Sequence, residues 1–328
     1  MTLLNYTKTT SVAGAKGVLD DIRTFAAAQS WIEDDYQSSI VWNSISGWVA
    51  GNDTFMQLRS VGYGSQNIAV RFYADDSSGI LHIKLVDPNN TTVIVSATHP
   101  MNQNSAVPSI YFNTALARSG IDMPSSNIPA VYCIGNSRFI ALYVQVESDK
   151  VFSYAFGIPD LLDYWISSKV SFLWTNYTRF YEGGSLAYDD DLTDLDDEVI
   201  DFSDYAPGSG YDQGYLESVA FDLATDNQYK IGFRWTSADD DIELPTSVWG
   251  KPLYTFYEAP HSGLRFMKKQ PVYFSASGVW YLMGYMPFWR INGYGITPGT
   301  ELDYGGQTYL TFPTLSSAYN PGTAFRVA

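Results

Sequence analysis

Two stretches of strand-forming side chains, each interrupted by a short turn, constrain the fold of this chain most. The first runs over residues 67–86 with a turn at 75–79, and the second runs over 138–156 with a turn at 147–150. The first stretch alternates with the period of two that places successive side chains on opposite faces of a strand, and the second is a run of apolar residues on either side of its turn. Both turns hold the polar residues that reverse a chain. Each stretch therefore predicts an antiparallel β-hairpin.

Strand patterns recur along the rest of the chain, whereas helical patterns are sparse. Residues 15–28 place apolar side chains at helical spacing, and a shorter helix is expected to start near Pro159, a good first-turn residue. Further strands are predicted at 91–97, 170–175, 216–223, 229–236, 253–257, 270–274, 280–287 and 307–312. Because regular strand–helix alternation is absent, the predicted class is mainly β. We expect an antiparallel β-sandwich-like body with an N-terminal helix and few peripheral helices.

The expected organisation is an N-terminal arm and helix over 1–35 and a β-rich body over 36–328. Composition changes over about 186–213, where an acidic run precedes a Pro-Gly-Ser-Gly sequence at 207–210. This segment could link two halves or be a long surface excursion from one domain. The strands on both sides look like parts of one sheet system, which favours the excursion.

Charge and apolar patterning exclude several classes of partner. The 328 residues carry a formal net charge of −16, which disfavours a surface that follows nucleic-acid phosphates. The longest apolar stretches, 139–146 and 279–289, are shorter than the roughly 20 residues that span a bilayer, so no membrane insertion is expected. The first residues lack the pattern of a secretory signal, and a single cysteine, Cys133, fits synthesis in a reducing cytosol.

Aromatic residues are abundant, while the usual catalytic side chains are scarce. The chain has nine Trp, 18 Phe and 25 Tyr residues but three His and one Cys. Rings bury large areas at interfaces, whereas imidazole and thiol groups carry most proton transfer and nucleophilic attack. We therefore expect a binding or assembly protein and no enzyme. The interface candidates, each of which core burial would explain equally well, are Trp31, Trp42, Trp48, Tyr177, Phe180, Tyr181 and Trp289.

The acidic excursion is the main candidate for a metal site. Alternate carboxylates on a loop can supply the oxygen ligands that Ca²⁺ prefers, but the mid-loop glycine and terminal glutamate of an EF-hand are missing. A solvated, self-repelling loop is the favoured interpretation, with a divalent cation as the alternative, and no other cofactor is expected. The candidate ligands are Asp189, Asp191, Asp194, Asp196 and Asp197.

Aromatic residues beside acids, as at 174–182, also fit a sugar-binding surface. A pair of carboxylates on opposite sides of a sugar could in addition cleave a glycosidic bond. We favour core and subunit contacts for these rings over both alternatives. The three histidines, His82, His99 and His261, are scattered and lack the spacing of metal ligands.

Three segments resemble virion proteins of tailed bacteriophages. The end of the predicted helix, IRTFAAAQSW at 22–31, is similar to their N-terminal element, in which Leu or Ile precedes Phe by three residues and Gly-Trp follows. The run YCIGNSRFIA at 132–141, with YAFGIP at 154–159, resembles their central pair of strands around Asn-x-Arg. The closing segments 280–285, 296–300 and 305–313 look like their C-terminal hairpin. The chain departs from the pattern at 164–169 and in the acidic excursion, so the resemblance does not specify the tail component.

The resemblance implies a structural component of a bacteriophage virion, in the tail or baseplate, made in the host cytoplasm. Such a protein acts by subunit assembly, with other virion proteins and copies of itself as partners. No catalytic residues are carried over from these relatives. The alternative is a receptor-binding tail protein that recognises a host surface glycan.

Overall fold

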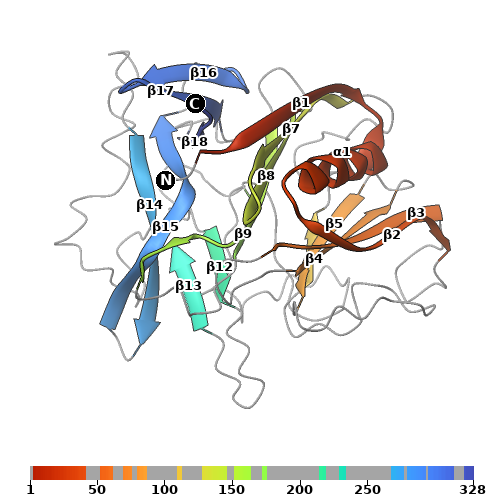
Figure 1. Cartoon of the computed structure of the whole chain (residues 1–328), viewed down its shortest axis with the longest axis horizontal. Coiled ribbons are helices and arrows are strands. Elements are labelled where there is room, and N and C mark those ends of the chain that lie inside the picture. Colours follow the sequence, from red (N-terminus) through yellow and green to blue (C-terminus); the bar gives the residue numbers. More distant parts are fainter. Residues whose placement is uncertain are drawn as a thin grey trace, which may run out of the picture.

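The computed structural model shows a mainly β protein with one helix in its described part (Figure 1). The mainly β prediction is thereby confirmed, with the helix near the N-terminus as expected. The residues that the structure describes are 3–41, 52–61, 69–75, 80–86, 109–112, 128–145, 151–163, 172–175, 214–218, 229–233, 267–276, 279–292, 295–313 and 321–328.

All strand pairs are antiparallel, and they form three larger sheets and one two-stranded sheet. The N-terminal sheet has the order β2 (Ile32–Val41), β3 (Asn52–Arg59), β4 (Ala69–Asp75), β5 (Ile80–Val86) and β6 (Ser109–Phe112). The central sheet has the order β1 (Asn5–Val12), β7 (Ile128–Gly135), β8 (Phe139–Gln145), β9 (Val151–Gly157) and β11 (Phe172–Thr175).

The third large sheet, the C-terminal sheet, collects strands from the second half of the chain. Its order is β10 (Asp160–Leu161), β15 (Val279–Asn292), β18 (Pro321–Arg326), β17 (Gln307–Pro313) and β16 (Thr300–Tyr304), and β14 (Met267–Ala276) also pairs with β15. Strands β12 (Gly214–Ser218) and β13 (Tyr229–Phe233) pair with each other.

Both predicted hairpins are confirmed. Strands β4 and β5 pair in the first, and β8 and β9 pair in the second. The predicted helix is α1 (Gly14–Ala28), which buries Val18, Leu19, Ile22 and Phe25 at helical spacing. The prediction at 15–28 is therefore correct to within one residue.

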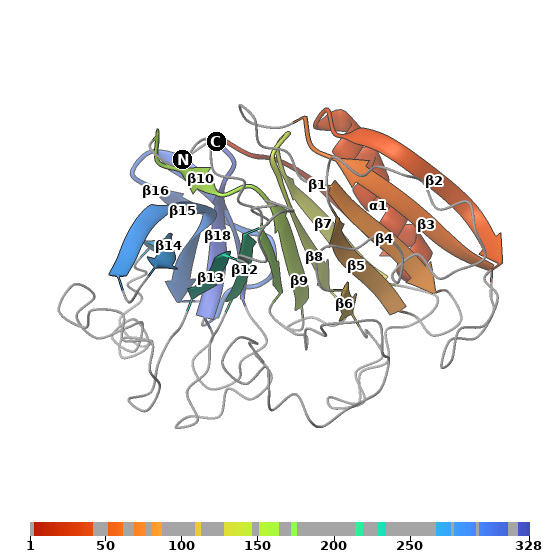
Figure 2. The ribbon, with the colours of Figure 1, turned by 90° about the horizontal axis from the view of Figure 1, so that it is seen from below.

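The central sheet is buried on both faces. Along β8, Phe139, Ala141 and Tyr143 pack against the C-terminal sheet, whereas the alternate residues pack against α1 and the N-terminal sheet. Figure 2 shows the central strands between these two layers. A strand covered on both sides needs apolar side chains on both, which explains the near-continuous apolar run of β8. The sandwich-like arrangement of the whole body stays a prediction.

The short helix expected near Pro159 does not begin at residues 160–161, and residues 164–171, which would continue it, lie outside the described part of the chain. Residues 160 and 161 form β10, whose backbone pairs with Tyr285 and Gly284 of β15. Pairing with a distant strand overrides the local first-turn preference of proline. The prediction failed because that pairing cannot be read from the neighbouring sequence. The strands predicted at 91–97 and 253–257 and the excursion at 186–213 lie outside the described residues.

Strand β1 is part of the central sheet, although the sequence predicts only an N-terminal arm there. It pairs with β7 from Asn5 to Val12, and most of its side chains are exposed. The backbone N–H of Leu4 also donates to the carbonyl of Arg326, 2.9 Å away, which joins the start of the chain to β18. The division of the chain at residue 35 stays a prediction.

Asp21 lies on α1 with a carboxylate that is poorly satisfied. Its Oδ2 atom is buried and has no hydrogen-bond partner within the described residues. Burial raises the pKa of Asp21, a hydrogen bond from Thr9 lowers it, and the neighbouring Asp20 raises it again. Since the folded state binds this proton more tightly than the unfolded state, stability is lost as pH rises from the unfolded pKa through the raised one.

Asp21→Asn is therefore expected to stabilise the chain at pH 7. The gain should be about 1 kcal/mol or less, because the half-buried carboxylate is partly screened by solvent. It should disappear at acid pH, where Asp21 is protonated in both states. Thermal denaturation between about pH 3 and pH 7 measures both effects. Asp163→Asn, at an exposed position, serves as control and should leave stability unchanged. If Asp21→Asn is no more stable than the wild type at pH 7, the raised pKa of Asp21 is contradicted.

Candidate binding face on the C-terminal sheet

The C-terminal sheet turns one face to the core, and its other face carries aromatic and cationic side chains. On that face Tyr309 is buried, whereas Lys269, Trp289 and Arg326 are partly exposed. Met286, Phe288, Leu310, Phe312 and Phe325 pack into the core against the central sheet. The other face follows from the strand register. Lys269 pairs with Trp289, Trp289 with Ala324, Ala324 with Thr311, and Thr311 with Thr300.

Tyr309 and Arg326 form the neighbouring pair on this same face. We call Lys269, Trp289, Tyr309 and Arg326 the cation–aromatic face. These four residues come from β14, β15, β17 and β18, so four strands of one sheet hold their backbones in place.

The rings and the ammonium group of this face contact one another. Lys269 Nζ lies 5.1 Å from the ring centroid of Tyr285 and 5.6 Å from that of Trp289, within cation–π range. The Trp289 and Tyr309 rings meet edge to face, with centroids 6.4 Å apart and planes at 88°. The Tyr309 hydroxyl donates to Gln307 Oε1 at 2.8 Å. The apolar residues beside them are Met267, Ile291, Ile296 and Ala324.

Two donors on this face lack acceptors. Trp289 Nε1 and Arg326 Nε are buried and have no hydrogen-bond partner among the residues that the structure describes. A buried donor without an acceptor costs about 1–3 kcal/mol, so each such group calls for a physical explanation. Burial raises the pKa of Tyr309, while the nearby guanidinium of Arg326 lowers it, which places that charge close to the phenol.

The charge of this part of the chain is opposite to that of the rest. Residues 265–328 hold five of the 19 Lys and Arg residues but only two of the 35 Asp and Glu residues. They carry a net charge of +3, whereas residues 1–264 carry −19. Both acids, Glu301 and Asp303, pair with residues Leu310 and Thr308, in positions that alternate with those of the cation–aromatic face.

One further acid lies near Lys269. Asp160 forms an ion pair with Arg138, with 3.7 Å between Oδ1 and Nη2. Burial raises the pKa of Asp160, and the positive charges of Arg138 and Lys269 lower it. Asp160 therefore already has Arg138 as its partner, at the edge of the sheet.

Among the interface candidates from the sequence, the structure describes Trp289 and Trp31. Trp289 is half-buried and lies on the cation–aromatic face. Trp31 is buried, packs edge-on against Phe156 and donates from Nε1 to the carbonyl of Asn136 at 2.8 Å. Packing within the core of this chain is therefore sufficient to explain Trp31. Outside the described residues lie Trp42, Trp48, Tyr177, Phe180 and Tyr181.

The metal candidates Asp189, Asp191, Asp194, Asp196 and Asp197 also lie outside the described residues. Within the described ranges, no three His, Cys, Asp or Glu side chains gather in a way that could hold a metal ion. No helix among them is long and apolar enough to cross a membrane.

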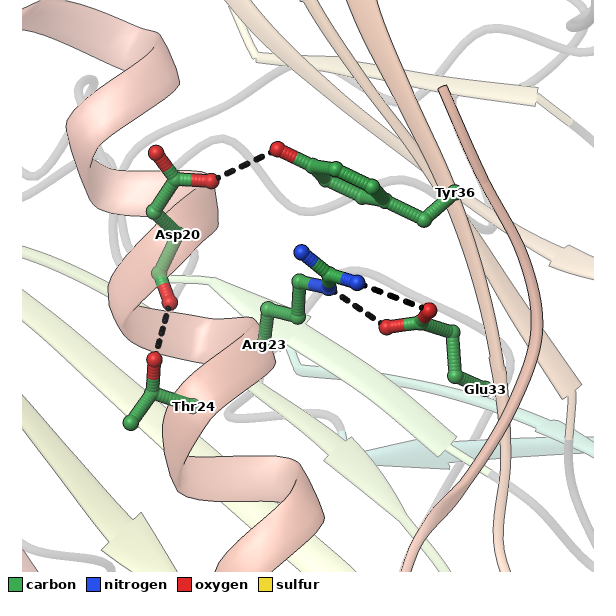
Figure 3. Close-up of polar contacts among 5 residues, drawn as sticks. All are labelled: Asp20, Arg23, Thr24, Glu33 and Tyr36. Atoms are coloured by element: carbon green, nitrogen blue, oxygen red, sulfur yellow. Dashed lines mark hydrogen bonds and ion pairs between the residues drawn. The ribbon is translucent and has the colours of Figure 1, made fainter. Parts of the chain in front are cut away.

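A second polar cluster joins α1 to the edge strand β2 (Figure 3). Arg23 binds both carboxylate oxygens of Glu33, at 2.5 and 2.9 Å, and its guanidinium carbon lies 3.5 Å from the ring centroid of Tyr36. The Tyr36 hydroxyl donates to Asp20 at 2.9 Å. These groups satisfy one another, so we interpret the cluster as a clamp that holds β2 on the helix.

A buried arginine crosses the N-terminal sheet. Arg71 is fully buried and donates from Nε to Gln57 Oε1 at 2.6 Å. Gln57 in turn donates to Asp34 at 3.4 Å, and Asp34 pairs with Arg59 at 3.1 Å. Burial lowers the pKa of Arg71 to about 10, which leaves it charged at neutral pH. This chain of polar contacts links β4, β3 and β2.

The single cysteine is unsuited to nucleophilic attack. Cys133 is buried in the core, and burial, followed by the charge of Asp21, raises the pKa of its thiol. The thiolate is the reactive form, so a raised pKa removes reactivity at neutral pH.

The sequence pattern points to Trp289 but not to Lys269, Tyr309 or Arg326. These residues are far apart in the chain and meet only through the strand order β14–β15–β18–β17. The positive charge of residues 265–328 in an acidic chain is the one sequence signal that could have pointed to them.

Comparison with known proteins adds no assignment to this geometry. No protein-family model matches the sequence, and no curated protein is significantly similar to it.

Proposed function

We propose that this chain is a structural component of a bacteriophage virion, in the tail or baseplate, and acts by subunit assembly. The observation that supports an assembly role is the cation–aromatic face. Trp, Tyr and Arg are the residues that most often dominate the binding energy of protein interfaces. Here they lie on a multi-stranded sheet, which holds a contact surface in place better than a loop does.

The virion context of this proposal rests on the resemblance of the helix, the central strands and the closing hairpin to tailed-phage proteins. Its partners would be other virion proteins and copies of itself, after synthesis in the host cytoplasm. The buried, unreactive Cys133 and the use of many rings in inter-sheet packing are in keeping with a non-catalytic role.

The test is the protein composition of purified virions from the phage that encodes this chain. Quantitative mass spectrometry should find the chain in a fixed number of copies per particle, enriched over the lysate. Its absence from purified virions would overturn the proposal.

Trp289→Ala is expected to reduce incorporation of the chain into particles at least about tenfold, because an interface anchor of this type contributes about 2 kcal/mol or more. The free energy of unfolding should also fall, because the half-buried Trp289 ring packs against Tyr309, so the Tm of the variant is measured to show that it is folded. Complementation of a phage that lacks the gene, with the chain quantified per particle, measures the effect. Tyr6→Ala, which removes an exposed ring from β1, is the control and should be incorporated normally. Equal incorporation of both variants would contradict an interface role for Trp289.

A receptor-binding tail protein is the alternative function. The partly exposed ring of Trp289 favours it, because sugars stack on aromatic rings. Binding of the purified chain to host surface polysaccharide, lost in Trp289→Ala, would support this alternative.

A further inference from the structure

We infer that the cation–aromatic face binds an acidic surface of a second copy of this chain, in a head-to-tail contact. This inference rests on the proposed assembly role and names the partner of that same face. Three properties of the molecule support it: charge, cations without a carboxylate partner, and the lack of self-complementarity.

Charge complementarity favours a second copy. The segment that holds the face carries a net charge of +3, and the other 264 residues carry −19. The larger, acidic part of a second copy therefore has the charge opposite to that of the cationic face. Opposite potentials steer encounter and exclude partners of the wrong sign.

The two cations of the face have no carboxylate partner in the described part of the chain. Lys269 lies over two rings, and neither Lys269 nor Arg326 forms an ion pair with a described residue. Both side chains are partly exposed. Carboxylates of a second copy would neutralise them, whereas a neutral sugar would leave both charges uncompensated.

The face is not complementary to itself. Among the side chains that the structure describes on it, the charged ones are Lys269 and Arg326, both positive, so two such faces would repel each other across a two-fold axis. The contact is therefore between different surfaces of the two copies. Contacts of this kind close into rings when the rotation between subunits permits, as expected for a symmetric part of a tail or baseplate.

Sedimentation velocity of the purified full-length chain tests this inference. At about 50 mM salt the chain should associate in a concentration-dependent manner, and at about 500 mM salt the association should weaken, because salt screens the contact. The double substitution Lys269→Glu and Arg326→Glu should raise the dissociation constant at least about tenfold at low salt. Near-ultraviolet circular dichroism and the Tm report whether the variant is folded.

The matched control reverses two lysines elsewhere, Lys8→Glu on β1 and Lys16→Glu on α1, with the same change in net charge. This control variant should associate like the wild type, because its cation–aromatic face is intact. The milder pair Lys269→Gln and Arg326→Gln gives a second test if charge reversal prevents folding. It should also weaken association, by a smaller factor.

The inference is overturned if the chain stays monomeric, if its association is insensitive to salt, or if both double variants associate like the wild type. It is likewise overturned if the Lys269 and Arg326 variants lose binding to host polysaccharide while self-association is unchanged. Presence of the chain in virions with any of these results would leave the proposed function intact. Salt-sensitive association of a chain that is absent from virions would overturn the proposed function and leave the head-to-tail contact intact.

Discussion

Gly157→Ala is expected to destabilise the chain by about 4 kcal/mol or more, because the new methyl group would meet backbone atoms that have no room to move. Gly157 has φ +148, and a Cβ atom there would lie 2.7 Å from the Cα of Phe139 and against the carbonyl oxygen of Arg138. Phe139 is the register partner of Gly157 across β8 and β9, so relief requires breaking the pairing. Urea denaturation followed by tryptophan fluorescence measures the loss.

Gly305→Ala is the matched control for this substitution. Gly305 also has positive φ, +60, but nothing lies within 4 Å of its added Cβ. Its cost should be limited to about 1–2 kcal/mol of backbone strain. Equal losses in the two variants would show that the close approach of β8 to Gly157 is not the cause.

Phe312→Ala is expected to cost about 3–5 kcal/mol, because it opens a cavity between the central and C-terminal sheets. Phe312 is fully buried and stacks on Tyr143 with centroids 3.9 Å apart and planes at 19°. Tyr132 and Phe325 meet its edges at 5.1 and 6.2 Å. Tyr143 is further fixed by a hydrogen bond between its hydroxyl and Thr323 Oγ1.

Because Phe312 attaches β17 to the central sheet, its loss should also loosen the cation–aromatic face. We expect Phe312→Ala to reduce self-association as well as the free energy of unfolding, measured by sedimentation and by urea denaturation. Phe312→Leu fills most of the cavity and should cost about 1–2 kcal/mol. If Phe312→Leu loses as much stability as Phe312→Ala, the cavity explanation is contradicted.

Local sequence patterns predict an element correctly where neighbouring residues alone determine its structure. The strand patterns and polar turns at 67–86 and 138–156 predict both hairpins, and helical spacing predicts α1. Patterns failed where a distant strand decides the structure. The polar segment Asn5–Val12 becomes a strand because β7 offers it an edge, and Asp160–Leu161 become β10 because β15 does.

The candidate site shows the same limit. The sequence marks Trp289 as one of nine tryptophans, but it does not distinguish it from Trp31, whose indole N–H is satisfied inside the fold. What separates them is the partner of each ring, and partners depend on strand order. Most of the described rings, such as Tyr132, Tyr143 and Phe325, pack between sheets, so the aromatic surplus serves the core before it serves any interface.

Hydroxyl-radical footprinting of purified virions tests most directly whether the chain assembles through the cation–aromatic face. Side-chain oxidation is compared between the free chain and the assembled particle, residue by residue. We predict that Trp289, which is half-exposed in the free chain, is oxidised at least about tenfold more slowly in the virion, because an interface anchor is excluded from water there. Oxidation of Trp289 at the same rate in both states, or the absence of the chain from the virions, would contradict assembly through this face.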